Sequence, residues 1–150
     1  MKPLILYHAN CWDGFCAAWI AKKAIGDIEA IPVQYSQDPP IDFCGRDVYI
    51  LDFSYPRQTM RTILSQSRFV CVLDHHKTAE KELDSLVDEF VQRPDLINNI
   101  PGSELPFIHF DMNKSGGRLA WEYFFEQRHA PAQTEPVSRP WLVDYTEDRD

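Results

Sequence analysis

Residues 69–76 read FVCVLDHH, an apolar run that ends on Asp74, His75 and His76. A short, continuous apolar run that is rich in Val is typical of a strand buried on both faces, as in a parallel sheet. Similar runs occur at Leu4–His8, Ala30–Tyr35, Val48–Phe53 and Pro106–Asp111. The sequence therefore predicts a sheet of five strands.

Helical patterns lie between most of these runs. After the first run, apolar residues at helical spacing are Phe15, Ala18, Trp19 and Ile25. After the third run they are Met60, Ile63 and Leu64. After the fourth run they are Ala79, Leu83, Leu86, Val87 and Phe90. A further helix is expected to begin at Ser115, whereas the connection 36–47 is too short and too rich in Pro for one. This alternation predicts an α/β fold, a doubly wound and mainly parallel five-stranded sheet with helices on both faces.

The chain has 150 residues, 44% of them hydrophobic, which is enough for one compact core and too little for two full domains. We expect residues 1–130 to form this α/β domain. Residues 131–140 contain Pro131, Pro136 and Pro140 and are interpreted as a linker. Residues 141–150 begin a further apolar element, so the chain reads as truncated.

Charge and composition exclude several classes of protein. The formal net charge of −8 argues against wrapping duplex nucleic acid through the general surface. No apolar run approaches the roughly 20 residues needed to span a bilayer, and the N-terminus turns polar too soon for a signal peptide. The four cysteines form no CxxC pair. A cytoplasmic protein with reduced thiols is the simplest prediction.

Polar residues gather at the ends of the predicted strands, where open parallel sheets bind their ligands. They are His8, Asp13, Asp52, Asp74, His75, His76 and Asp111. Each alone has an ordinary explanation, such as a helix cap or a turn. Together they bring carboxylates to one edge, where the charges repel one another unless a cation lies between them. Divalent metals that prefer oxygen with some imidazole supply that cation, so the sequence predicts a metal site.

Five segments also carry a resemblance to a known family. They are YHANCWDGF (7–15), LDFS (51–54), LDHHKT (73–78), DMNKSGG (111–117) and YTEDRD (145–150). In this order they resemble the DHH phosphoesterase superfamily, which includes RecJ-type exonucleases, nucleases of very short RNA, cyclic-dinucleotide phosphodiesterases and family II inorganic pyrophosphatases. The resemblance implies that residues 1–130 are the catalytic domain. It also implies a smaller C-terminal domain that grips the substrate, and we expect this domain to be absent from the chain.

The resemblance implies two bound divalent ions, with Mn²⁺ expected and Mg²⁺, Zn²⁺ or Fe²⁺ as alternatives. The implied metal ligands are His8, Cys11, Asp13, Asp52, Asp74, His75 and Asp148. Asp52 is the candidate bridging ligand, which requires Asp52 and His75 to lie within about 10 Å of each other. Asp74 would bind metal or orient a ligand imidazole. His76 would contact the phosphoryl oxygens or protonate the leaving group.

The first motif departs from the family pattern, because Cys11 stands where a second Asp is usual. A thiolate favours softer ions than Mn²⁺, so this metal position is expected to be weaker or to hold zinc or iron. The alternative is a buried cysteine that only packs.

Lys114, Ser115, Gly116 and Gly117 begin a helix directly after the fifth strand. Exposed backbone N–H groups at such a point suit a phosphate, which makes these residues candidates for substrate binding. The alternative is structural: Ser115 caps the helix and the glycines permit close packing.

The leading hypothesis is a phosphoesterase that cleaves a phosphodiester of a small nucleotide or short oligonucleotide. The rivals are an inorganic pyrophosphatase or polyphosphatase, and a relative that binds nucleotide or metal without turnover. Without a second lobe the domain is expected to bind metal yet to catalyse slowly. A homodimer could supply the missing wall of the site.

Overall fold

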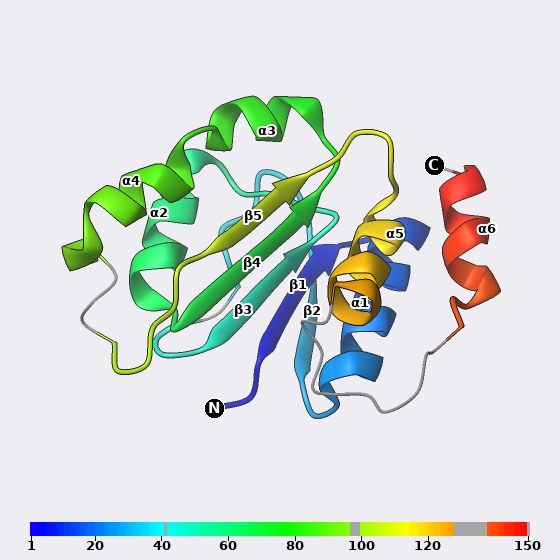
Figure 1. The fold of residues 1–150 in the computed structure, drawn as a ribbon, viewed down its shortest axis with the longest axis horizontal. Coiled ribbons are helices and arrows are strands. Elements are labelled where there is room, and N and C mark those ends of the chain that lie inside the picture. The colour runs from blue at the N-terminus through cyan, green and yellow to red at the C-terminus, as the bar shows by residue number, and fades with distance from the viewer. Residues whose placement is uncertain (41, 97–99, 128–137, 150) are drawn as a thin grey trace.

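The computed structural model describes residues 1–40, 42–96, 100–127 and 138–149. Its centre is a five-stranded sheet (Figure 1). The strands are β1 (Leu4–His8), β2 (Glu29–Val33), β3 (Asp47–Leu51), β4 (Phe69–Asp74) and β5 (Phe107–Phe110). All neighbours pair in parallel, so the predicted sheet is confirmed and is wholly rather than mainly parallel.

The strand order in the sheet is β2-β1-β3-β4-β5, so β2 lies on one side of β1 and all later strands lie on the other. From β1 the chain moves outward to β2, and from β3 it moves the other way through β4 to β5. The connections of β1 and β3 therefore diverge beyond the carboxyl ends of these strands. In open parallel sheets such a divergence leaves the crevice in which ligands bind.

Helices cover both faces, as the sequence predicts. They are α1 (Trp12–Ile25), α2 (Arg57–Gln66), α3 (Lys77–Leu83), α4 (Leu86–Gln92), α5 (Gly116–Trp121) and α6 (Trp141–Arg149), with a 3₁₀ turn at Pro94–Leu96 and a π-helical turn at Glu122–Glu126. In Figure 1, α1 and α5 lie together on one side of the sheet, and α2, α3 and α4 lie on the other.

Side chains that alternate along each strand fill two separate cores. Ile5 and Leu73 point toward α1 and α5, whereas Leu6 and Val72 point toward α2 and α4. All four are at most 1% exposed. Burial on both faces explains why the strands read as continuous apolar runs rather than as alternating ones.

The apolar stripe over residues 79–90 predicted one helix, and the structure has two. Ser85 adopts a left-handed backbone conformation, with φ of 62°, which ends α3 and begins α4. The guanidinium of Arg57 donates hydrogen bonds to the carbonyl oxygens of Glu82 and Asp84, at 3.0 and 2.7 Å. These bonds satisfy carbonyls that a continuous helix would have paired internally.

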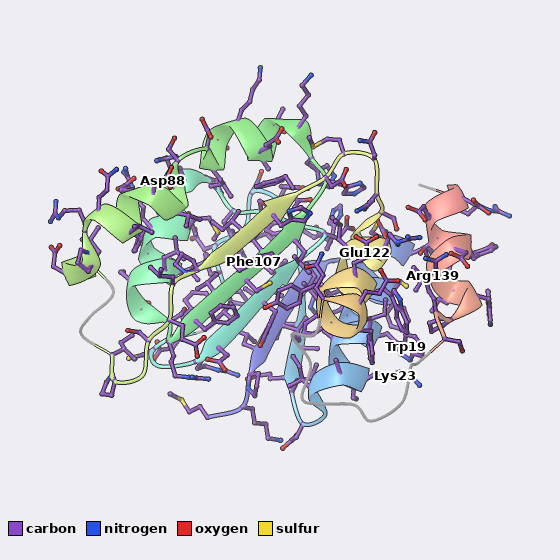
Figure 2. All side chains as sticks on the ribbon, in the orientation of Figure 1. Trp19, Lys23, Asp88, Phe107, Glu122 and Arg139 are labelled. Carbon is purple, nitrogen blue, oxygen red and sulfur yellow. The ribbon has the colours of Figure 1, made fainter. Side chains whose placement is uncertain are left out.

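The C-terminal element predicted over 141–150 is the helix α6, which packs on α1 and α5 through the buried residues Val143 and Thr146. Figure 2 shows Trp19 and Lys23 on α1, where the ammonium lies 4.7 Å from the centre of the indole ring. Most of the predicted linker, residues 131–137, lies outside the described part of the chain. Within the described part, no helix has the length and apolar character needed to cross a membrane.

Candidate metal centre

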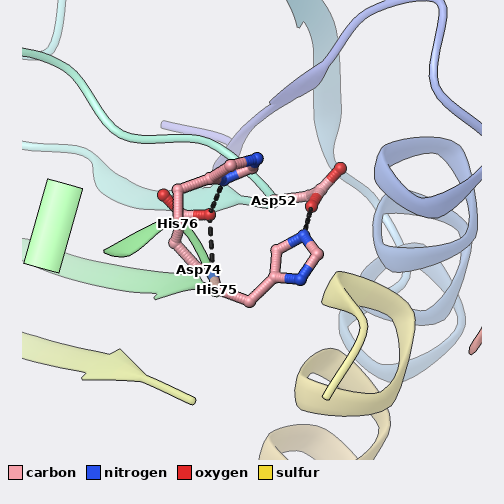
Figure 3. Close-up of side chains that lie close together, drawn as sticks. All are labelled: Asp52, Asp74, His75 and His76. Atoms are coloured by element: carbon pink, nitrogen blue, oxygen red, sulfur yellow. Dashed lines mark hydrogen bonds and ion pairs between the residues drawn. The ribbon is translucent and has the colours of Figure 1, made fainter. Parts of the chain in front are cut away.

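Four side chains meet where β3 and β4 end (Figure 3). Asp52, Asp74, His75 and His76 each offer a ligand atom within 4.8 Å of the others, and we call them the β4 group. Nε2 of His75 lies 2.9 Å from Oδ1 of Asp52. The predicted proximity of Asp52 and His75 is therefore confirmed.

A second set of ligand atoms adjoins the first. His8, at the end of β1, and Cys11, just before α1, lie with Asp52 in what we call the β1 group. Nδ1 of His8 is 3.6 Å from Oδ2 of Asp52, and the Cys11 thiol donates a hydrogen bond of 3.4 Å to the same oxygen. Asp52 thus belongs to both groups and turns one oxygen toward each. This is the arrangement required of a carboxylate that bridges two ions.

Asp52 is held in an unusual backbone conformation. Its φ of 56° lies in the left-handed region, and its N–H donates to the carbonyl of Leu73 at 2.9 Å. Asp tolerates this region better than most residues, at a cost that the surrounding structure must offset. In this backbone conformation, the side chain of Asp52 points from the end of β3 into the space between the two groups.

The buried Oδ1 atom of Asp52 accepts no hydrogen bond from the described residues. Its contact with His75 Nε2 has the distance of an ion pair but lacks the directional geometry of a hydrogen bond. A buried carboxylate oxygen without a hydrogen bond is costly, and a cation would remove that cost. The oxygen and imidazole donors around it suit Mn²⁺, Mg²⁺, Zn²⁺ or Fe²⁺, so the residues present fit a divalent metal.

Asp74 is fully buried and organises the two histidines that follow it. Its Oδ1 accepts hydrogen bonds from the His75 N–H at 2.8 Å and from Nδ1 of His76 at 2.6 Å. Its Oδ2 accepts one from Ser54 Oγ at 2.6 Å, a contact that the sequence does not predict. The bond to Asp74 raises the pKa of His76, despite an opposing effect of burial.

Asp13 lies beside the two groups and is fixed by the start of α5. Its carboxylate accepts hydrogen bonds of 2.6 Å from the backbone N–H groups of both Gly116 and Gly117. Its Oδ2 is also 3.6 Å from Nε2 of His75. The N–H groups that were candidates for binding phosphate therefore hold an acidic side chain of the same protein.

The remaining residues of that segment also have partners within the chain. Ser115 Oγ accepts a hydrogen bond from the Arg118 N–H at 3.0 Å and so caps α5. Lys114 Nζ lies 2.8 Å from Glu122 and 3.3 Å from Asp111. A role for residues 114–117 in substrate binding stays a prediction.

Gly116 permits the close approach of α5 to the centre. A Cβ atom at this position would lie 2.6 Å from Cβ of Asp52, closer than real side chains come. Any larger residue would therefore displace either Asp52 or the start of α5. The absence of a side chain at Gly116 therefore allows the start of α5 to pack directly against Asp52, the candidate bridging ligand.

Besides Asp13, the predicted residues Asp148 and Asp111 lie outside both groups. Asp148 is exposed on α6 and belongs to neither group, so its role as a metal ligand stays a prediction. The reason is helical geometry, since the buried residues Val143 and Thr146 face α1 and α5 and leave Asp148 toward solvent. Asp111 accepts a hydrogen bond from the Asn113 N–H and pairs with Lys114.

Comparisons with known proteins assign no activity to this chain. No family model and no solved structure matches it. It is similar to an uncharacterised protein of Acanthamoeba polyphaga mimivirus, with 28% identity over 144 aligned residues. The alignment covers 85% of this chain but only 30% of the viral protein. The chain therefore spans about a third of the length of that relative.

Tyr35 is a further neighbour of the centre, one that the sequence motifs do not point to. Its hydroxyl lies 3.5 Å from Nδ1 of His76, and its ring lies 4.6 Å from that of Phe53 and 5.3 Å from that of His8. Burial, together with the charges of Asp74 and Asp52, raises its pKa. Its place at the end of the second apolar run was the signal that could have revealed it.

Cys11 lies in the β1 group and is only partly buried, so it is not one of the core cysteines. Burial, reinforced by the charge of Asp52, raises the pKa of its thiol. Without a cation it is therefore protonated at neutral pH and donates to Asp52. To bind a metal it would have to release that proton.

Glu122, at the π-helical turn after α5 (Figure 2), is expected to make stability depend on pH. Burial would raise its pKa, but hydrogen bonds from Lys114 and Arg118 outweigh burial and lower it. The lowered pKa stabilises the fold above the pKa of an unfolded Glu, and the contribution is lost as the pH falls through the folded value.

The expected result is a free energy of unfolding that falls by about 1–2 kcal/mol over this acidic range, measured by urea denaturation. In Glu122→Gln this part of the pH dependence should disappear. Glu80→Gln, on the partly exposed surface of α3, is the control and should retain it. An unchanged pH profile in Glu122→Gln would contradict the assignment.

Proposed function

We propose that this protein is a metal-dependent phosphoesterase that hydrolyses a phosphodiester bond of a small nucleotide or short oligonucleotide. The observation that carries the proposal is the position of Asp52, buried between two sets of ligand atoms with one oxygen lacking a hydrogen bond. The resemblance of five sequence segments to the DHH phosphoesterases supports the same reaction.

The two groups would hold two divalent ions, for which we propose Mn²⁺. His8, Asp52 and Cys11 would hold one, and Asp52 with His75 the other. Asp13 would support the second position from its fixed place beside His75. When bound, such ions lower the pKa of a water molecule and neutralise charge on phosphoryl oxygens.

His76 is the proposed general acid for the leaving oxygen. Its Nδ1 atom is engaged by Asp74, which leaves Nε2 as the ring atom free to transfer a proton. The side chain is 38% exposed and lines a cavity of about 650 Å³ that also contains Tyr35, Phe53 and Ser54. A substrate in this cavity could therefore reach His76 without displacing the buried Asp74.

The charge around the centre favours a short substrate. The described residues that line this cavity include Asp38 and Glu82 but neither Lys nor Arg. With a net charge of −8, the protein would repel a long polyanion along most of its surface. We therefore propose that recognition is confined to a few nucleotides at the metals. A cytoplasmic location, in which the free thiols stay reduced, is part of the proposal.

A hydrolysis assay on a panel of dinucleotides and pyrophosphate, with and without added Mn²⁺, tests the proposal. We expect cleavage of dinucleotides that depends on Mn²⁺ and stops with a chelator, and no cleavage of pyrophosphate. Cleavage of pyrophosphate alone would replace the proposal by a pyrophosphatase. Tight binding of nucleotide without turnover would replace it by a binding protein.

Replacing His76 with Asn is expected to lower kcat by about 10²–10⁴-fold, because the leaving oxygen then departs without a proton. The effect should fall on kcat rather than on KM, as measured by steady-state kinetics on the best dinucleotide. His109→Asn, on β5 and outside both groups, is the matched control and should keep the wild-type kcat. An equal loss in the two variants would contradict the role of His76.

A further inference from the structure

A groove with a neutral lining borders the β1 group. It encloses about 740 Å³ and is lined by Tyr7, Ala9, Asn10, Cys11, Trp12, Phe15, Pro32, Gln34 and Gln37. Cys11 lines this groove and is also a member of the β1 group. The groove is therefore continuous with the candidate metal centre.

Two aromatic side chains at the start of α1 stand out into solvent beside this groove. Trp12 is 78% exposed and Phe15 is 54% exposed, whereas Asp13 and Gly14 between them are buried. Residues three apart on a helix are neighbours, so the two rings lie on the same side of α1. Large exposed aromatic rings next to a polar centre are typical of a site that stacks a flat ligand.

The polar residues of the groove are amides. Asn10, Gln34 and Gln37 are exposed, and each can both donate and accept hydrogen bonds. The described lining contains no Asp, Glu, Lys or Arg. A neutral planar ring with donors and acceptors on its edge matches this lining, whereas a charged peptide or a phosphate does not.

We propose that this groove binds a nucleobase of the substrate, stacked on Trp12 and Phe15 and hydrogen-bonded at its edge by the amides. The proposal rests on the proposed function, because it names the part of the nucleotide that lies beside the scissile phosphodiester. Stacking does not depend on the identity of the base, so the groove binds purines and pyrimidines alike. Its volume lies in the range of small-ligand sites rather than of protein interfaces.

The test compares a dinucleotide with its abasic analogue, which has the same phosphodiester and sugars but no bases. Binding to the Mn²⁺-loaded protein is measured by calorimetry in the His76→Asn background, which prevents turnover from consuming the ligand. We expect the dinucleotide to bind about 5- to 150-fold more tightly than the abasic analogue. In Trp12→Ala this ratio should fall toward one, and Trp12→Phe should restore most of it.

Phe15→Ala is the second variant and should lower the ratio less than Trp12→Ala. Trp141→Ala is the matched control, because Trp141 on α6 is similarly exposed, at 74%, and lines neither cavity. A ratio that stays high in Trp12→Ala and Phe15→Ala, or that equals one in the unchanged protein, overturns the proposal. A groove covered by a second copy of the chain would also give a ratio of one.

This binding measurement, taken together with the hydrolysis assay on the unchanged protein, separates this proposal from the proposed function. If the dinucleotide is cleaved but the abasic analogue binds equally well, the function stands and the groove assignment fails. If the bases are recognised through Trp12 but Mn²⁺ supports no cleavage, the groove assignment stands and the function fails.

Discussion

Asp52→Asn is expected to abolish binding of two Mn²⁺ ions, with a loss of affinity greater than about 100-fold at each group. The side chain turns one oxygen toward His8 and Cys11 and the other toward His75, so a single substitution affects both groups. Asn is preferred to Ala because it keeps the shape of Asp and tolerates the left-handed backbone at this position. The variant should therefore fold.

Isothermal titration calorimetry with Mn²⁺ measures the effect. Asp111→Asn is the matched control, because Asp111 follows a strand at the same edge but belongs to neither group. It should bind Mn²⁺ as the unchanged protein does. Two tight sites remaining in Asp52→Asn would refute the assignment of Asp52 as the shared ligand.

Gly116→Ala is expected to have a large effect, although it adds only a methyl group. That methyl would lie 2.6 Å from Cβ of Asp52, so the start of α5 or the turn at Asp52 must move. We expect the free energy of unfolding to fall by about 1–3 kcal/mol and the affinity for Mn²⁺ to fall with it. Thermal unfolding and calorimetry measure the two quantities separately.

Ser115→Ala separates these effects from a general weakening of α5. It removes the hydrogen bond that caps the helix and should cost about 1 kcal/mol of stability. Because the hydroxyl of Ser115 bonds within α5, to the N–H of Arg118, its loss should leave the affinity for Mn²⁺ unchanged. Equal losses of metal affinity in Ser115→Ala and Gly116→Ala would show that the close approach of Gly116 is unimportant.

The sequence was sufficient to predict the sheet and much of the edge that carries the centre. Strands buried on both faces leave long apolar runs, and the polar residue that ends each run marks the point where the strand leaves the core. His8, Asp52 and Asp74 are such residues. Because parallel strands place these ends side by side, the pattern also predicted which side chains meet.

Other features depend on contacts between distant segments and leave no local signal. The backbone N–H groups of Gly116 and Gly117 donate hydrogen bonds to Asp13 because α5 packs beside α1. The sequence of neither segment alone predicts this packing. The break between α3 and α4 depends on Arg57, which lies on another helix. Asp148 matched a family motif, but the face on which α6 packs turns it toward solvent.

The bonds between Asp13 and α5 connect residues that are 103 and 104 positions apart in the chain. Closing so large a loop has an entropic cost, and contacts of this separation form slowly and late in folding. A chain that has been synthesised only as far as β5 already contains His8, Cys11, Asp52 and His75 but has no α5 to hold Asp13. The nascent protein therefore acquires a fully supported centre only after α5 has emerged and docked.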